Sequence, residues 1–255
     1  MLDVRKMREA DRLVSFFTED EGKIRGVAAS AAKSRRRFGG KLERLSRVRV
    51  TYFEKEGREL ARIDSCDLLD ESFTLHQDLR VATTLAYVAE IVDTFARERE
   101  ADRRYFRLIK SLIAALKEQG DARLLARYFE VWTLRLHGLL PDLDRCGACG
   151  KDLMRPGGGG AEIEAGDMPV ALCPACRRAA GAPAGRLVRL SAGSLTALER
   201  FRKLAPAALT KEDLSPAVMT EIERFGVALL TAFVGREFRS YRFLGELGFA
   251  EGDAT

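Results

Sequence analysis

The chain lacks the features that mark secreted and membrane proteins. Five cysteines in 255 residues are too few for a secreted disulfide scaffold of this size, and four of them fall into two CxxC pairs. No apolar run approaches the roughly 20 residues that a membrane helix needs. The segment MLDVRKMREA at residues 1–10 has no apolar core like that of a signal peptide. We therefore expect a soluble, cytoplasmic protein with no membrane partner.

Signatures of catalysis are missing as well. The sequence contains no glycine-rich phosphate-binding loop, no HExxH motif and no nucleophile elbow. The two histidines, His76 and His137, stand alone beside predicted helices, where surface or core-edge positions are the ordinary explanation. We predict no catalytic residue and expect that the chain is not an enzyme.

Acidic residues are nearly absent from residues 23–49, which hold ten Lys and Arg but one acid, Glu43. Residues 1–69 hold 17 basic and 12 acidic residues, whereas residues 70–255 hold 26 of each, so the net charge of +5 lies in the first segment. Most charge runs are solvated surface, but the scarcity of acids here favours a bound polyanion. The candidate nucleic-acid contacts are Lys23, Arg25, Lys33, Arg35, Arg36, Arg37, Lys41 and Arg44, with Phe38 as the candidate for base stacking.

Residues 1–69 are predicted to form a small barrel. Alternating apolar residues and glycine-containing turns predict strands at residues 2–7, 12–18, 23–30, 47–54 and 60–68. Five short strands with one long connection, between the third and the fourth, are typical of the OB-fold. Such barrels bind single-stranded nucleic acid in a basic groove with stacking aromatics. Of Tyr52 and Phe53 on the fourth strand, at least one should face the core.

Residues 70–255 have the 3.6-residue period of helices. The expected caps are Asp78, Asp121, Ser191 or Ser194, and Ser215. The predicted helices cover residues 79–98, 105–119, 122–138, 191–205 and 214–235. The predicted fold class is therefore α+β, with an OB-fold barrel at residues 1–69 and a helical bundle domain at residues 70–255.

Two CxxC pairs interrupt the helical domain. CGAC holds Cys146 and Cys149, CPAC holds Cys173 and Cys176, and 23 residues separate the pairs. This spacing is typical of zinc ribbons, in which four thiolates surround Zn²⁺. A redox-active disulfide is the competing interpretation, but we expect neither pair to have the strand-to-helix context of thioredoxin-like sites. We predict one structural Zn²⁺ in an inserted zinc module at residues 143–180.

Three stretches resemble the bacterial recombination mediator family RecO. EADRLVSFFTEDEGKIRGVAASAAKSRRRFGGKLE is similar to the family's amino-terminal signature, LDRCGACG with LCPAC to its zinc knuckles, and REFRSYRFL to the end of its C-terminal helix. The resemblance implies a non-enzymatic protein of the bacterial cytoplasm and nucleoid that binds single- and double-stranded DNA. It also implies annealing of complementary strands, and loading of RecA together with RecR and the single-strand-binding protein SSB.

Two other functions stay open from the residues themselves. A zinc-ribbon protein that acts on RNA or on the transcription machinery would show the same motifs, and it would prefer RNA to DNA. The other possibility is a protein-interaction scaffold with incidental basic charge. Loss of all nucleic-acid binding when Arg35, Arg36 and Arg37 are replaced by Ala would argue against it.

Overall fold

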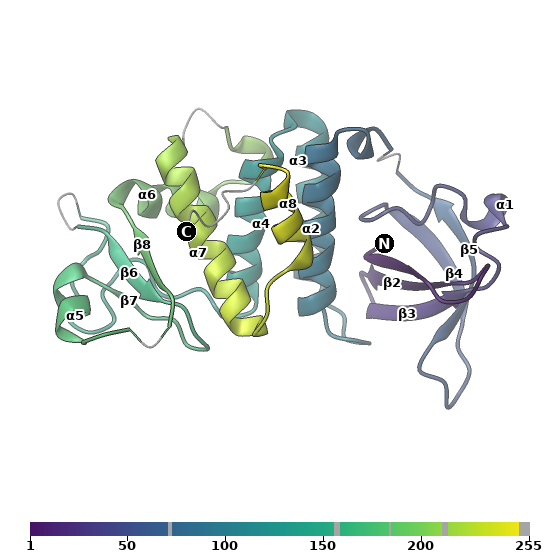
Figure 1. Ribbon diagram of the computed structural model, residues 1–255, viewed down its shortest axis with the longest axis horizontal. Coiled ribbons are helices and arrows are strands. Elements are labelled where there is room, and N and C mark those ends of the chain that lie inside the picture. The colour runs from purple at the N-terminus through teal and green to yellow at the C-terminus, as the bar shows by residue number, and fades with distance from the viewer. Residues whose placement is uncertain (71–72, 156–158, 184, 211–213, 250–255) are drawn as a thin grey trace. The chain divides into compact units, whose positions relative to one another are not determined.

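The structure is a computed structural model that describes residues 1–70, 73–155, 159–183, 185–210 and 214–249. It consists of two compact units. The first is Met1–Ile113 with the C-terminal segment from Phe238, and the second is Ala114–Glu237. Strands dominate the beginning of the chain and helices the remainder, as Figure 1 shows, so the predicted α+β class is confirmed. The domain boundary predicted after residue 69 follows the last barrel strand and stays a prediction.

The five barrel strands begin and end within two residues of their predicted positions. They are β1 (Asp3–Lys6), β2 (Arg12–Thr18), β3 (Gly22–Ala28), β4 (Val48–Phe53) and β5 (Ala61–Leu68). The sheet order is β1-β2-β3-β5-β4, and β3 pairs with β5 in parallel. A three-strand meander followed by this crossover is the Greek-key arrangement of the OB-fold, which confirms that prediction.

The barrel core is built from alternate residues of each strand. On β4 the side chains of Val48, Val50 and Tyr52 are turned inward, while Arg49 and Phe53 are exposed. The long connection after β3 contains one short helix, α1 (Arg35–Phe38). Its last residue completes the core from one side of the barrel.

Helix α2 (Leu79–Phe95) is attached to the barrel through β3. The Lys23 Nζ donates to the carbonyl oxygen of Asp93 (2.5 Å), and two backbone hydrogen bonds join Lys23 to residues 97–100 (3.1 and 3.2 Å). A Cβ at Gly22 would lie 2.0 Å from a carbonyl oxygen of this segment, so only glycine permits the approach. Barrel and α2 therefore belong to one unit.

Two further helices complete the first unit. Helix α8 (Arg239–Glu246) contacts α2, where Glu90 accepts hydrogen bonds from the backbone N–H groups of Arg239 and Ser240 (3.2 and 2.9 Å). The amino-terminal part of α3 (Arg103–Gln119) meets β2, where the ring of Phe17 lies 6.0 Å from that of Tyr105. Phe238, the residue before α8, supplies no side-chain cap, so the carboxylate of Glu90 is the group that accepts from the first turn.

The second unit contains the remaining helices and a small sheet. Its main helices are α4 (Ala122–Leu136), α6 (Ala192–Lys203) and α7 (Pro216–Val234). The predicted caps are confirmed: Asp78 caps α2, Asp121 caps α4, Ser191 rather than Ser194 caps α6, and Ser215 caps α7. Strands β6 (Ala161–Glu164), β7 (Ala171–Leu172) and β8 (Leu187–Leu190) form a sheet in the order β7-β6-β8, next to the short helix α5 (Pro174–Ala179).

Four charged side chains lie between α4 and α7. Arg127, Glu130 and Glu223 are at most 2% exposed. The Arg127 guanidinium bonds to Glu130 (2.7 Å) and to Glu223 (2.6 Å), and Arg123 bonds to the other oxygen of Glu223 (2.8 Å). Burial raises the pKa of Glu223, but the two guanidinium groups outweigh this effect and hold the pKa below its ordinary value. We call these residues the buried ion network.

The close approach of the two helices depends on a glycine. A Cβ at Gly226 on α7 would lie 2.6 Å from the Oε2 atom of Glu130 on α4.

In the part of the chain that the structure describes, no helix is both long and apolar enough to cross a bilayer.

Replacing Glu223 by Ala should destabilise the protein strongly, because Arg127 and Arg123 would lose the carboxylate that they share and Glu130 alone would face the buried positive charge. We expect a loss of about 3–5 kcal/mol in the free energy of unfolding, measured by urea denaturation at neutral pH. The loss should narrow as the pH falls below the ordinary pKa of a glutamate toward the lowered pKa of Glu223 in the folded protein, because protonation then removes the same charge from the wild type. Glu246→Ala, which removes an exposed partner of Arg242, should cost less than about 0.5 kcal/mol. Equal losses would contradict the role of the network.

Candidate functional site

Four thiols of the second unit converge on one point. The Sγ atoms of Cys146, Cys149, Cys173 and Cys176 lie within 4.8 Å of one another, and those of Cys149 and Cys173 are 3.9 Å apart. Thiolates placed about 2.3 Å from a tetrahedral Zn²⁺ are separated by roughly 3.8 Å. The cluster can therefore hold a metal ion, and its size and soft donors are compatible with zinc.

Two turns present these thiols. In the first, the Cys146 N–H donates to the Lys151 carbonyl oxygen (2.8 Å), and Gly150 has a φ of +71°, which favours glycine. In the second, Cys173 precedes α5 and Pro174 occupies the first helical position. The Cys173 N–H donates to the Cys146 sulfur (3.3 Å), so each turn helps to orient the other.

Backbone N–H groups favour the thiolate form of two cysteines. Burial raises the pKa of Cys146, but the N–H groups of Cys173, Cys149 and Ala148 outweigh it and lower the pKa to about 6. The N–H of Cys176 likewise lowers the pKa of Cys173. Hydrogen bonds to its sulfur neighbours raise the pKa of Cys176 to about 12. Since thiolates are the metal-binding form, these donors suit a cationic ligand.

One detail of the second pair differs from the sequence-based expectation. Cys173 stands between strand β7 and helix α5, so this pair does have a strand-to-helix context. Its thiols nevertheless belong to a group of four, and all five cysteines of the chain are free thiols. The group of four still favours a metal over a redox-active pair.

The basic run separates into two sets in the structure. Three of its cations serve the fold: Lys23 holds α2, Arg25 pairs with Glu98 (2.7 Å), and Arg37 donates to the carbonyl oxygens of Ala29 (2.9 Å) and Asp64 (3.2 Å). These side chains are therefore poor candidates for phosphate contacts.

Phe38 lies in the barrel core and is 3% exposed, with the Arg37 guanidinium over its ring. The expected stacking on bases does not fit this position, because no face of the ring is open to a base. Its neighbours in sequence gave no sign of burial, since three arginines precede it.

Four residues of the second set are open to solvent, while the fifth, Lys41, is 22% exposed and lies 3.8 Å from Asp67. Lys33, Arg35 and Arg36 are exposed, and none makes a side-chain hydrogen bond or ion pair within the described residues. Lys41 donates to the Arg36 carbonyl oxygen (2.9 Å), and Arg44 pairs with Asp3 (3.3 Å) while half-exposed. These five residues keep the predicted role as a proposal.

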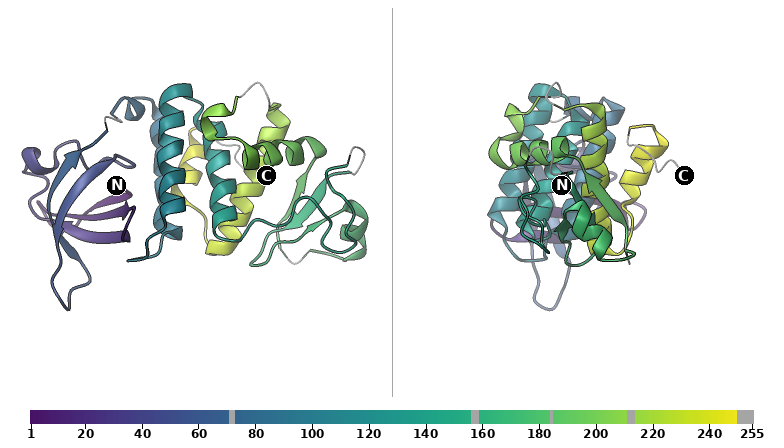
Figure 2. Two further views of the ribbon diagram at one scale, coloured as in Figure 1. Left: turned by 180° about the vertical axis from the view of Figure 1, so that it is seen from behind. Right: turned by 90° about the vertical axis from the view of Figure 1, so that its left-hand side faces the viewer.

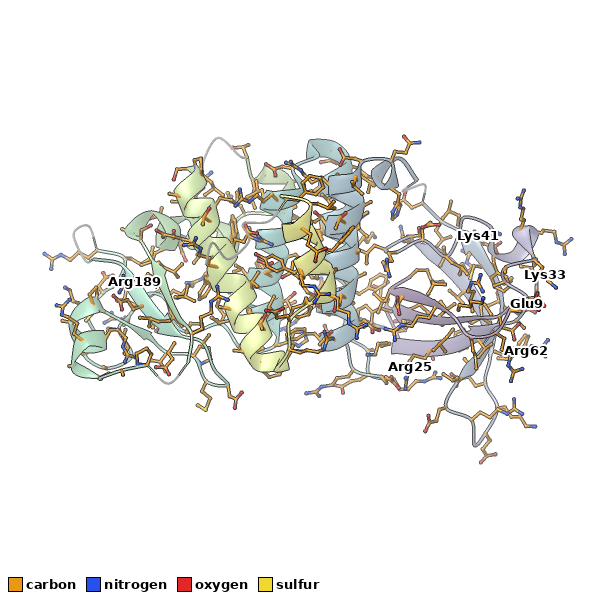
Figure 3. The ribbon with its side chains drawn as sticks, viewed as in Figure 1. Glu9, Arg25, Lys33, Lys41, Arg62 and Arg189 are labelled. Carbon is orange, nitrogen blue, oxygen red and sulfur yellow. The ribbon has the colours of Figure 1, made fainter. Side chains whose placement is uncertain are left out.

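A groove of about 590 Å³ lies between the β1–β2 and β4–β5 loops of the barrel. Its lining includes three exposed arginines, Arg8, Arg58 and Arg62, and two acids, Asp11 and Glu59. Figure 3 shows Arg62 at the same end of the barrel as Lys33, whereas Arg25 lies nearer α2. In OB-folds these two loops flank the oligonucleotide-binding face.

The sequence analysis did not assign these groove residues. Phe53, 60% exposed, faces Arg62 across β4 and β5 and offers an open aromatic ring. The alternation Val48, Val50, Tyr52 could have placed Phe53 outward, because residues two apart on a strand share a face. Arg8 and Arg58 lie in loops, where only the barrel topology identifies their position.

Known proteins similar to this chain share one description. The family model for the recombination protein O C terminal matches residues 76–242, and that for the N terminal matches residues 1–72. A DNA repair protein RecO of Anaeromyxobacter sp. (strain K) is 34% identical over 94% of this chain and 91% of its own length. That of Koribacter versatilis is 47% identical over 58% of this chain and 60% of its own length, and that of Moorella thermoacetica is 29% identical over 97% and 89%.

Replacing Lys23 by Ala should weaken the fold rather than an open surface. The variant loses a charged hydrogen bond to Asp93 at a side chain that is 13% exposed, so we expect a loss of about 1.5–3 kcal/mol in the free energy of unfolding. Lys33→Ala removes an exposed cation and should change it by less than about 0.5 kcal/mol. Urea denaturation of both variants measures the difference, and equal values would refute this division of the basic run.

Proposed function

This chain belongs to the recombination protein O family, and from that premise we propose that it is a non-enzymatic recombination mediator. It binds single- and double-stranded DNA, anneals complementary strands and, with RecR, helps to load RecA on DNA covered by SSB. The family establishes a role in DNA repair and recombination. The observation that carries the finer proposal is the OB-type groove with its free guanidinium groups.

Phosphate contacts account for the first step. Six exposed cations that have no acidic partner among the described residues are available near the groove and the adjoining loop: Lys33, Arg35, Arg36, Arg8, Arg58 and Arg62. Point charges that reach phosphates do not read base sequence. Binding should therefore depend on salt and little on sequence.

Annealing follows from the same surface. Two strands repel each other through their phosphates, and a cationic face lowers the cost of bringing them together. Base pairing supplies the free energy, so no nucleotide hydrolysis is required. The bases must stay accessible for pairing, and among the exposed aromatic rings of the barrel Phe53 is the one beside the groove cation Arg62. A groove that stacked every base would inhibit pairing.

The cysteine cluster is proposed to hold one structural Zn²⁺. Cys146, Cys149, Cys173 and Cys176 would occupy all four positions of a tetrahedral ion, which leaves none for water. Bound zinc would join the two turns and stabilise the small β6–β8 sheet. Its role is then in folding, while RecR and SSB remain partners assigned through the family alone.

Annealing without nucleotide tests the proposed function. We expect the protein to accelerate pairing of complementary strands, both bare and covered with SSB. Its affinity for single strands should fall with salt at a slope near −4 in log K against log salt for six contacts. The variant Lys33→Gln, Arg35→Gln, Arg36→Gln should flatten this slope by about 2.

A control variant removes three exposed cations that are each paired with an acid: Arg189, Lys203 and Arg242, all to Gln. It should keep the wild-type slope and annealing rate. No acceleration on either substrate, or the same slope in all three proteins, would sink the proposal.

Metal analysis tests the zinc site. Purified protein should contain about one zinc per chain, and Cys146→Ala should contain almost none. Cys66→Ala should keep the metal, because Cys66 is a buried thiol of the barrel. Removal of the metal with a chelator should lower the melting temperature, since metal binding contributes to folding in small zinc modules. A metal-free protein of unchanged stability would contradict the assignment.

A further inference from the structure

Helix α3 is strongly basic, although residues 70–255, which contain it, have no net charge. It holds Arg103, Arg104, Arg107, Lys110 and Lys117 but a single acid, Glu118. Its net charge is therefore +4, whereas residues 70–255 as a whole hold equal numbers of acids and bases. The cations of this helix had no place in the predicted DNA interface.

The cations lie on the side of α3 opposite its core face. Tyr105, Leu108 and Leu112 are buried, while Arg103, Arg107 and Lys110 are exposed. At 100° per residue these three fall within an arc of about 60°, and they extend over roughly 10 Å along the helix axis. Arg104 is also exposed and lies about 60° outside this arc. We call these four exposed cations the α3 stripe.

Among the described residues, one cation of the stripe has an acidic partner, since Arg103 pairs with Asp20. On two other helices an exposed cation is paired along the same helix: Lys203 with Glu199 (3.0 Å) and Arg242 with Glu246 (3.7 Å). Within the described residues, Arg104, Arg107 and Lys110 make no ion pair or side-chain hydrogen bond. A surface that served only solubility would not require this separation of charge.

The stripe is anchored to the barrel. Phe17 of β2 packs on Tyr105 and Phe106 at ring distances of 6.0 and 6.1 Å, and Arg103 pairs with Asp20 of the β2–β3 turn (2.7 Å). These residues belong to the same compact unit as the groove. The rear view in Figure 2 shows α3 in the foreground. Any strand held on the stripe thus stays with a strand held by the barrel.

We propose that the α3 stripe binds the phosphate backbone of a second DNA strand while the barrel groove binds the first. This inference rests on the proposed function and adds a place for the second substrate. With a rise of 3.4 Å per nucleotide, a stripe of roughly 10 Å meets about three phosphates. The stripe consists of Arg and Lys side chains that reach phosphates, so the bases of the second strand are left free to pair.

A two-strand capture assay tests this site. Full-length protein is saturated with donor-labelled oligo(dT), and acceptor-labelled oligo(dC), which cannot pair with it, is titrated while energy transfer is measured. We expect the wild type to capture the second strand. The variant Arg104→Gln, Arg107→Gln, Lys110→Gln should bind oligo(dT) within about two-fold of wild type, yet flatten the salt slope of second-strand capture by about 2. It should also anneal complementary strands several-fold more slowly.

Two comparison proteins separate charge from folding. The variant Arg104→Lys, Arg107→Lys keeps the charge and should behave as wild type. The Arg189, Lys203, Arg242 control loses the same charge elsewhere and should also capture the second strand normally. Second-strand capture by the Gln variant equal to that of this control would overturn the stripe, while failure of the wild type to bind oligo(dT) at all would overturn the proposed function with it.

Discussion

Strand β3 is the element on which the first unit depends, because three other segments are built on its backbone. It pairs with β2 on one edge and with β5 on the other, and Lys23 extends the pairing to residues 97–100. Gly26 permits the close approach of β5, since a Cβ there would lie 2.8 Å from the Ala61 carbonyl oxygen. The same alternation that turns Ile24 inward directs Lys23 and Arg25 to the attachment of the helical segment, and this leaves the far end of the barrel for ligands.

The second unit is held by electrostatics of a different kind. Its helices meet over the buried ion network, and its small sheet stands beside four converging thiols. In both arrangements the charged side chains or thiols come from distant parts of the sequence and meet only in the folded unit.

Local patterns explain what the sequence could predict. Strand alternation, helix caps such as Asp121 and Ser215, and the two CxxC pairs act within a few residues, so the corresponding elements and the thiol cluster were predictable. Phe238 before α8 cannot act as a side-chain cap, and no separate helix was predicted at these residues. The roles of the basic residues depend on partners far along the chain: the partner of Lys23 is 70 residues away. Charge density predicted an interface, but the fold decides which cations reach it.

The buried ion network also limits how this sequence can change over evolutionary time. Arg127 needs both carboxylates, Glu130 leaves no space for a side chain at Gly226, and Glu223 needs its guanidinium partners. Loss of one charged member unbalances the charges of a buried interface, whereas simultaneous exchange for apolar residues of similar volume can be neutral or favourable. Single substitutions are therefore disfavoured and coordinated ones are accessible, so these positions are expected to drift as a group across relatives.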